Sequence, residues 1–329
     1  MQNKKNNPTV SIIIVSFNVK ELLRKCILSI EEKFVGISYE IIVVDNNSKD
    51  RNQEMIENHF PAIRLVKNKA NLGFAQANNQ GIKIAKGEYI ILINSDTEIM
   101  NNHIKDAIAH MEENLHIGIL GPKIFFPNGN LQTSAVRFRT ILSVFAHHFK
   151  LKNVLPSETI RKFVIINFGK FLGKTIKSYL QVYREDNNPF MVDWVTGAFM
   201  LIRKEVFKDI GYLDEDYVMY SEDEDFCLRA NKAGWKMVYY PRLEIIHHVG
   251  ASVTGNPLIS AERYRSSLIF WHKHHPFWKV FIVRAITFIS FGIKYTLPRK
   301  KEFKVVYRQI LKYTIHNLAY IKTHRFMHI

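Results

Sequence analysis

The sequence predicts an α/β protein built on a doubly wound, mostly parallel sheet. Short β-branched and aliphatic runs recur in the first hundred residues, and helix-like segments separate them. Such continuous apolar runs are typical of parallel strands, which are covered on both faces. Polar residues gather directly after three of the runs, at the sheet edge where ligands of open α/β sheets bind. The runs are VSIIIVSF (10–17), YEIIVVD (39–45), IRLV (63–66) and EYIILIN (88–94).

Helices are expected between these strands because the intervening segments have apolar residues at helical spacing. The first is VKELLRKCILSI (19–30), the second follows Ser48, and the third is FAQANNQGIKIA (74–85). Strand, helix and strand repeated at this spacing predict right-handed crossovers and a doubly wound sheet. IGILGPKIFF (117–126) is expected to add a further strand.

The size and composition are those of a folded protein. The chain has 329 residues, 47% of them hydrophobic, enough for one large domain with an appendage. Cys26 and Cys227 lie in segments expected to be helical, so no disulfide framework is expected. The polar start MQNKKNNP does not resemble an export signal. We therefore expect a cytoplasmic protein in a reducing compartment.

The net charge of +16 predicts a partner that carries phosphate. Nucleic acid, a nucleotide ligand and an anionic membrane all fit, and charge alone does not choose among them. The basic residues are enriched in 137–184 and again after 260, whereas the first hundred residues are close to balanced. The excess charge therefore belongs to an insertion and a tail.

The strand ends carry the polar residues of a ligand site. Asp, Asn and Ser are also common turn and N-cap residues. Their presence after three different strands nevertheless favours a ligand site. No G-x-G-x-x-G and no P-loop follows any strand, so a dinucleotide-binding dehydrogenase loses its main support. The strand-end residues are Asn18, Asp45 and the run Asn94, Ser95 and Asp96.

A histidine late in the chain is the best partner for Asp96, whose strand end holds one acid. IIHHVGAS (245–252) ends an apolar strand on His247 and continues into a loop. A neutral imidazole, one carboxylate and two phosphate oxygens would complete a Mn²⁺ or Mg²⁺ shell. Structural or surface roles are the default for the remaining histidines considered, His147, His148, His272, His274 and His275.

Four acids are packed into YSEDEDFCLR (220–229). Ser221 and Glu224 have the spacing of a capping box, and Asp225 and Arg229 have that of an i, i+4 ion pair. Helix chemistry therefore leaves Glu222 and Asp223 least explained. An acid at such a helix entrance could take a proton from a hydroxyl nucleophile.

Six ordered motifs together resemble the family 2 glycosyltransferases, and the bacterial rhamnosyltransferase-like group most of all. The resemblance covers about residues 9–255 and implies a GT-A fold, a nucleotide-diphospho-sugar donor, a divalent metal and transfer with inversion. The motifs are VSIIIVSFN, IIVVDNNSKD, NKANLGFAQANNQGIKIAKGEYIILINSDT, WVTGAFMLIRKEVF, GYLDEDYVMYSEDEDFCLR and HHVGAS.

The resemblance also implies roles for single residues. Asp223 is the expected general base beside Glu222, and Asp96 is the remaining acid of a D-x-D motif in which Asn94 replaces the first acid. His247 is the expected second metal ligand. On the donor side the resemblance assigns Phe17, Asn18, Asp45, Asn71, Gly73, Asn79, Asn94, Ser95 and Asp96, and at the border of donor and acceptor Trp194, Thr196 and Gly197.

Two domains are expected. Residues 9–255 form a catalytic domain with a basic helical insertion at about 137–185, and residues 256–329 form a helical extension. Within the extension, 266–301 is aromatic, apolar and basic, and Lys279, Arg284 and Lys294 argue against a spanning helix. An amphipathic helix on an anionic leaflet and a helix packed on the catalytic domain are both open interpretations.

The function expected is transfer of a sugar from a dTDP-, UDP- or GDP-linked donor to a saccharide hydroxyl. A lipid-linked acceptor in bacterial surface polysaccharide synthesis suits the basic tail and the resemblance, with the protein peripheral on the inner face of the cell membrane. No nucleic-acid partner is expected. The alternatives are a nucleic-acid-binding protein, which leaves the strand-end acids unexplained, and an inactive protein that binds sugar nucleotides.

Overall fold

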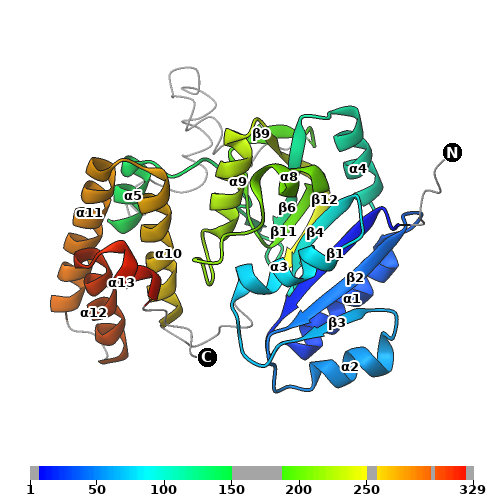
Figure 1. The fold of residues 1–329 in the computed structure, drawn as a ribbon, viewed down its shortest axis with the longest axis horizontal. Coiled ribbons are helices and arrows are strands. Elements are labelled where there is room, and N and C mark those ends of the chain that lie inside the picture. The colour runs from blue at the N-terminus through cyan, green and yellow to red at the C-terminus, as the bar shows by residue number, and fades with distance from the viewer. Residues whose placement is uncertain (1–6, 150–186, 250–257, 298–300, 324–329) are drawn as a thin grey trace. The chain divides into compact units, whose positions relative to one another are not determined.

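The computed structural model describes residues 7–149, 187–249, 258–297 and 301–323 (Figure 1). They divide into two compact units. The sheet unit takes the described residues of 1–136, 184–215 and 222–254, and the helical unit takes those of 137–183, 216–221 and 255–329. The described part of the expected insertion, 137–149, therefore groups with the C-terminal extension. Its larger part, from residue 150 to about 185, lies outside the described residues.

Four parallel strands make the first half of the sheet, as the sequence predicted (Figure 1). β1 (Val10–Ser16) lies between β2 (Tyr39–Asp45) and β4 (Tyr89–Asn94), and β3 (Arg64–Lys67) pairs with β2. Helices connect these strands in the three segments where the sequence predicted them: α1 (Lys20–Lys33), α2 (Asn52–His59) and α3 (Phe74–Ile84). The carboxyl ends of these strands share one edge.

The second half of the sheet is mixed. β11 (Phe199–Arg203) runs antiparallel between β4 and β6 (Ile117–Phe125), and β12 (Lys236–His247) runs parallel to β6. β5 (Thr97–Ile99) closes the order β3-β2-β1-β4-β11-β6-β12-β5. Short strands and helices complete the unit: β7 (Leu131–Gln132), β8 (Ala135–Val136), β9 (Phe190–Val192), β10 (Trp194–Val195), α4 (Ile104–Glu113), α8 (Lys204–Ile210) and α9 (Glu222–Lys232).

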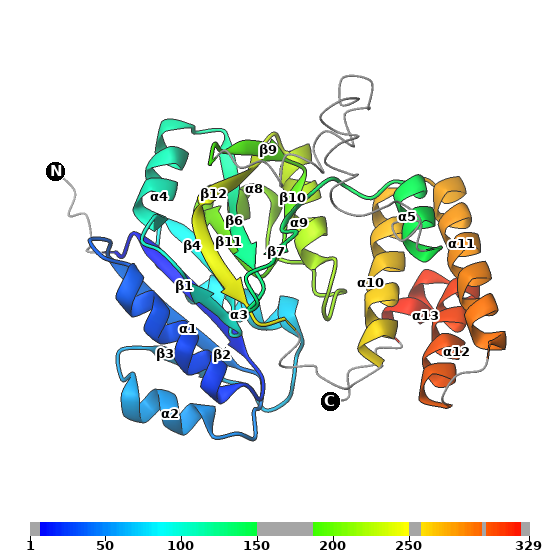
Figure 2. The ribbon, with the colours of Figure 1, turned by 180° about the vertical axis from the view of Figure 1, so that it is seen from behind.

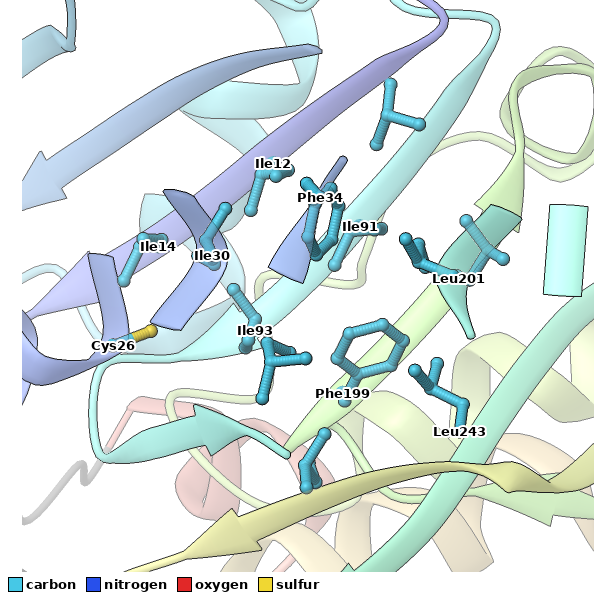
Figure 3. Packing of buried hydrophobic residues seen from close by; sticks show 14 of the residues in the cluster. Ile12, Ile14, Cys26, Ile30, Phe34, Ile91, Ile93, Phe199, Leu201 and Leu243 are labelled. Carbon is cyan, nitrogen blue, oxygen red and sulfur yellow. The ribbon is translucent and has the colours of Figure 1, made fainter. Parts of the chain in front are cut away.

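The core of the sheet unit is a layer of aliphatic and aromatic side chains that bridges both halves of the sheet (Figure 3). Each fully buried side chain of this size contributes about 1.5–3 kcal/mol. Cys26 belongs to this layer, and burial raises the pKa of its thiol to about 12. Cys26 and Cys227 are both buried and unbridged, which confirms that no disulfide joins them. Figure 3 labels Ile12, Ile14, Cys26, Ile30, Phe34, Ile91, Ile93, Phe199, Leu201 and Leu243.

The helical unit consists of short and long helices that pack on one another (Figure 2). The apolar segment 266–301 does not form one continuous helix. Pro276 lies just after the end of one helix, at His274, and is the N-cap of the next, which begins at Phe277. Among the described residues, no helix has the length and apolarity needed to cross a membrane. The helices are α5 (Ile141–His148), α10 (Leu258–His274), α11 (Phe277–Thr296), α12 (Lys301–Ile315) and α13 (Leu318–Thr323).

Candidate active site

The sheet brings Asp96 and His247 together although 150 residues separate them. The apolar run of β4 ends at Asn94, and a two-residue turn places Asp96 before β5. β5 pairs antiparallel with the end of β12, with Thr97 opposite His247. Oδ1 of Asp96 lies 3.2 Å from Nε2 of His247, and both side chains are nearly buried. The structure thus places these two predicted residues in contact.

Asn94 and Gln132 fix the imidazole of His247 from two sides. Oε1 of Gln132, on β7, lies 3.2 Å from Nδ1, and Nδ2 of Asn94 lies 3.3 Å from Nε2. A glutamine oxygen can only accept, so it pairs with a hydrogen on Nδ1, and Nε2 is the ring nitrogen that faces the Asp96 carboxylate. A proton on Nε2 or a cation bound to both atoms makes this 3.2 Å approach favourable.

This pair has the geometry of two neighbouring metal ligands. Ligands at right angles on an ion at about 2.1 Å lie about 3 Å apart, close to the observed separation. Gln132 is placed to supply the outer hydrogen bond that would orient the ring if His247 held a metal. The described residues contain no cluster of three or more His, Cys, Asp or Glu side chains with metal-site geometry. Gln132 was not predicted, because a two-residue strand leaves no pattern in the sequence.

Asp223 is held at the start of α9 by two backbone amides. The amide of Gly197 donates to Oδ2 and that of Glu224 donates to Oδ1, both at 2.8 Å. The residue after Gly197, Ala198, accepts from the Asn94 amide at 3.0 Å. One short loop before β11 therefore contacts both the Asp223 carboxylate and the end of β4. This brings the predicted base and the Asn94 strand end to the same loop.

One of the remaining acids of the motif, Asp225, makes the ion pair that its spacing predicted. Asp225 is 1% exposed and pairs with Arg229 at 2.7 Å. Arg229 also donates to the carbonyls of Ile210 and Tyr212, so this pair anchors α9 to the end of α8. Glu222 and Glu224 are buried as well, whereas Asp223 remains partly exposed and accepts from the Gly197 amide, which lies outside its helix.

Of the three border residues, Gly197 lies next to this carboxylate. A side chain at Gly197 would have its first carbon 3.6 Å from Asp223 Oδ2 and 3.5 Å from Phe74, so glycine leaves room beside the carboxylate. Thr196 donates its amide to the carbonyl of Ser134, and Trp194 lies in β10.

Asp45 and Asn18 tie the first two strand-end loops together. The buried Asp45 carboxylate accepts from Asn52 Nδ2 at 2.9 Å and from the Ser48 amide at 3.3 Å. Asn18 has a left-handed backbone (φ 53°), and its Oδ1 accepts from the Lys49 amide at 2.7 Å. Phe17, which directly precedes Asn18, is half-buried. A nucleobase contact by Asp45 stays a prediction, since its oxygens are hydrogen-bonded within the protein.

Asn71 and Gly73 shape the turn into α3, but Asn79 has a different partner. Oδ1 of Asn71 accepts from the Gly73 amide at 3.0 Å, and Gly73 adopts φ 82°, which glycine favours. The Asn79 amide group instead exchanges two hydrogen bonds with the backbone of Leu213, at 2.8 and 3.1 Å. Asn79 therefore holds the loop after α8, and its donor-binding role stays a prediction.

Comparison with known families now identifies the class. A family model described as "Glycosyl transferase family 2" matches residues 11–211, and one described as "Glycosyl transferase family group 2" matches 176–321. The first match covers more than half of the chain. The chain therefore belongs to glycosyl transferase family 2 and is a glycosyltransferase.

Curated relatives point to a rhamnosyltransferase-like group. An "N-acetylglucosaminyl-diphospho-decaprenol L-rhamnosyltransferase" of Mycobacterium tuberculosis is 27% identical over 253 residues, 72% of this chain and 76% of the relative. "Rhamnosyltransferase WbbL" of Escherichia coli is 26% identical over 251 residues, 73% of this chain and 83% of the relative.

Solved structures confirm the predicted GT-A fold. GalNAc-T7, crystallised with UDP, GalNAc and Mn²⁺, matches with a TM-score of 0.57 at 18% identity, covering 98% of this chain and 58% of that one. Staphylococcus aureus TarS, in complex with UDP-GlcNAc, matches with a TM-score of 0.55 at 17% identity, covering 93% and 80%.

Proposed function

We propose that this glycosyltransferase moves a sugar, with inversion, from a nucleotide-diphospho-sugar to a hydroxyl of a lipid-linked saccharide. The observation that carries the proposal is the contact of Asp96 with His247 at a strand end whose neighbouring loop holds Asp223. The name of the mycobacterial relative, with its decaprenol-linked saccharide, supports the acceptor class. A dTDP-, UDP- or GDP-linked donor fits the fold.

In this proposal Asp223 is the general base. Its carboxylate takes the proton of the acceptor hydroxyl, whose oxygen forms a bond to the anomeric carbon. The bond between that carbon and the diphosphate breaks on the opposite face, and its electron pair leaves with the diphosphate. The Gly197 amide keeps one carboxylate oxygen in place. A Mn²⁺ or Mg²⁺ ion held by Asp96 and His247 would stabilise the charge on the leaving diphosphate.

A screen of nucleotide sugars tests the function. We expect one donor to raise the melting temperature by several degrees with Mn²⁺ or Mg²⁺ present, and much less with a chelator. The same donor should support transfer to a lipid-diphosphate-linked saccharide. Absence of stabilisation and of transfer with every donor and both ions would contradict the proposal.

We also propose that the outer face of α11 rests on the membrane that carries the acceptor. Every α11 residue that is highly exposed is uncharged, and Phe277 (81% exposed) and Phe281 (63%) are far more exposed than aromatic residues usually are. Arg284 is turned inward, where it donates to the carbonyls of Thr314 and His316 at 2.6 Å each. The exposed apolar residues of this face are Phe277, Trp278, Phe281, Phe288, Ile289 and Ile293.

Charge indicates which membrane this face would meet. Residues 255–329 contain 14 Lys and Arg against two Glu, so the extension is strongly basic. An apolar helix face beside a basic surface is typical of helices that lie on anionic leaflets, where each cation contributes about 1 kcal/mol.

Vesicle flotation tests the membrane contact. The full chain should float with vesicles that contain phosphatidylglycerol, and less with neutral vesicles or in high salt. Changing Phe281 and Ile289 together to Glu should abolish flotation. Changing Val35 and Leu115 of the sheet unit, which are at least as exposed, to Glu is the matched control. Flotation that survives the first pair of changes, or is lost equally in the control, would refute this face.

A further inference from the structure

Left-handed backbones gather in two loops of the sheet unit, the loop 17–19 between β1 and α1 and the loop 46–51 between β2 and α2. Asn18 lies in the first loop, and Asn47 and Arg51 lie in the second, with φ of 53°, 67° and 62°. In the described part of the sheet unit, no other non-glycine residue has a positive φ. Such conformations cost free energy and persist only where the surrounding structure imposes them.

Asp50 supports both loops with one carboxylate. Its Oδ2 accepts from the amide of Lys20, the first residue of α1, at 2.6 Å, and its Oδ1 accepts from the amide of Asn52, the first residue of α2, at 3.2 Å. The residues that precede these helices, Val19 and Arg51, make no side-chain cap bond. The first amides of a helix need an outside acceptor, and a negative charge is favoured there. Asp50 therefore caps two helices at once.

Three further hydrogen bonds join the same two loops and their strands. The Asn18 amide donates to Oγ of Ser48 at 3.0 Å, and Asn18 Oδ1 accepts from the Lys49 amide at 2.7 Å. The Asn46 amide donates to the carbonyl of Ser16 at 2.9 Å. With the double cap, these bonds hold the backbone of the first loop against that of the second.

The double cap also connects to Asp45, the residue predicted to meet the nucleobase. The side chains of Asn52 and Gln53, in the first turn of α2, donate to the two oxygens of Asp45, the former at 2.9 Å. Asn52 Nδ2 also lies 3.0 Å from Oγ of Ser16 on β1, to which it can donate. Because Asp50 binds the Asn52 amide, the start of α2 links the double cap to the Asp45 carboxylate.

We infer that Asp50 is a positioning residue for the nucleoside half of the donor. It holds the loops 17–19 and 46–51 in their left-handed shape before the donor binds, so that little ordering remains to be done on binding. This inference rests on the proposed nucleotide-sugar donor and on the predicted contact of Asp45 with the base. The nucleoside is separated from the reacting carbon by the diphosphate, so the effect of Asp50 is on donor affinity and not on the chemical step.

Asp50→Ala tests the inference, with Ser11→Ala as its matched control. Ser11 Oγ likewise accepts from two backbone amides, those of Lys86 and Gly87, at 3.1 and 2.8 Å. Ser11 is buried near the amino end of β1, whereas the two loops follow the carboxyl ends of β1 and β2. Both variants should lower the melting temperature, but only Asp50→Ala removes a contact with these loops.

Calorimetric titration of UDP, dTDP and GDP in the presence of Mn²⁺ measures the affinity of the full chain. Asp50→Ala should bind the preferred nucleotide roughly tenfold more weakly or worse, whereas Ser11→Ala should stay within about threefold of wild type. In a transfer assay, Asp50→Ala should raise KM for the donor by a similar factor, with kcat at saturating donor close to wild type.

Asp50→Asn provides a second variant, in case Asp50→Ala folds poorly. Its amide has one acceptor oxygen and can cap only one of the two helices, so its affinity should fall between those of wild type and Asp50→Ala. Equal affinities in wild type and both Asp50 variants, or an equal loss in Ser11→Ala, would overturn the inference. If the wild type bound none of the three nucleotides, the proposed function would fail as well, so the two failures are distinguishable.

Discussion

The backbone amide of Gly197 donates a 2.8 Å hydrogen bond to Oδ2 of Asp223. The partners lie 26 residues apart, on the loop before β11 and on the first turn of α9. An ionised carboxylate that accepts from amides on both oxygens has one preferred orientation, and such charge-assisted bonds are the stronger kind. The proposed base is therefore held in place before any substrate arrives.

Replacing Gly197 with Ala should impair turnover without unfolding the protein. The new methyl group would meet only ordinary contacts, at 3.5–3.6 Å, but it would stand beside Asp223 Oδ2, where the acceptor hydroxyl must come. We expect kcat to fall at least tenfold in a transfer assay, with the melting temperature nearly unchanged.

Gly118→Ala is the opposite control. Its methyl group would lie 2.8 Å from Val206 and 3.0 Å from the Cβ of Trp235, away from Asp223. Overpacking of this kind costs about 1–3 kcal/mol in unfolding experiments, while kcat of the folded enzyme should persist. Unchanged kcat in Gly197→Ala would show that the space beside the carboxylate is not used.

Gln132 should control metal affinity through His247. Gln132→Leu removes the acceptor of the Nδ1 hydrogen bond, and loss of such an outer partner typically weakens metal binding about 10- to 100-fold. Gln132→Glu supplies a stronger acceptor and should retain tight binding. Titration of Mn²⁺, followed by donor-dependent thermal stabilisation, measures both. Equal Mn²⁺ affinities in the wild type and Gln132→Leu would rule out this role.

His148 should make the helical unit sensitive to acid. Burial, aided by Lys294 and His147, lowers the pKa of His148 from 6.5 to about 4. Between pH 6.5 and pH 4, His148 is therefore largely protonated in the unfolded chain and largely neutral in the folded chain. As the pH falls from 6.5 to 4, protonation of His148 in the unfolded chain should lower the free energy of unfolding by about 3 kcal/mol.

Urea unfolding at several pH values checks the His148 prediction. His148→Gln should flatten the dependence between pH 6.5 and pH 4, because the buried titrating group is gone. The exposed neighbour His147 provides the control, and His147→Gln should retain most of the slope. Identical slopes in all three proteins would exclude His148 as the cause.

Local patterns in the sequence predicted most of the sheet unit. The four parallel strands lie within a residue of their apolar runs, and the i, i+4 spacing of Asp225 and Arg229 does mark an ion pair. The contact of Asp96 with His247 could also be predicted, because His247 ends an apolar strand and Asp96 follows the end of another by two residues. Parallel topology then brings such ends to one edge.

Other contacts had no local signal. Gln132 reaches His247 from a two-residue strand, and Asn79 bonds to Leu213, 134 residues away. Asp216 pairs with Lys273, and the Met219 carbonyl accepts from Ser266, so both bond to residues more than forty positions later in the chain. Neither apolar periodicity nor short motifs carry information on tertiary hydrogen bonds of this kind. The capping-box spacing of Ser221 and Glu224 likewise gave no hint that Asp223 would accept from the Glu224 amide.

The most direct test of the central claim is transfer by Asp223→Asn compared with its donor binding. The variant keeps the shape of the side chain and loses only the ability to take a proton. Turnover should fall roughly 100- to 10,000-fold, as expected for loss of a general base. Donor affinity measured calorimetrically with Mn²⁺ should stay within a few-fold of wild type, whereas Asp96→Ala should weaken it. An Asp223→Asn enzyme with wild-type turnover would contradict the account.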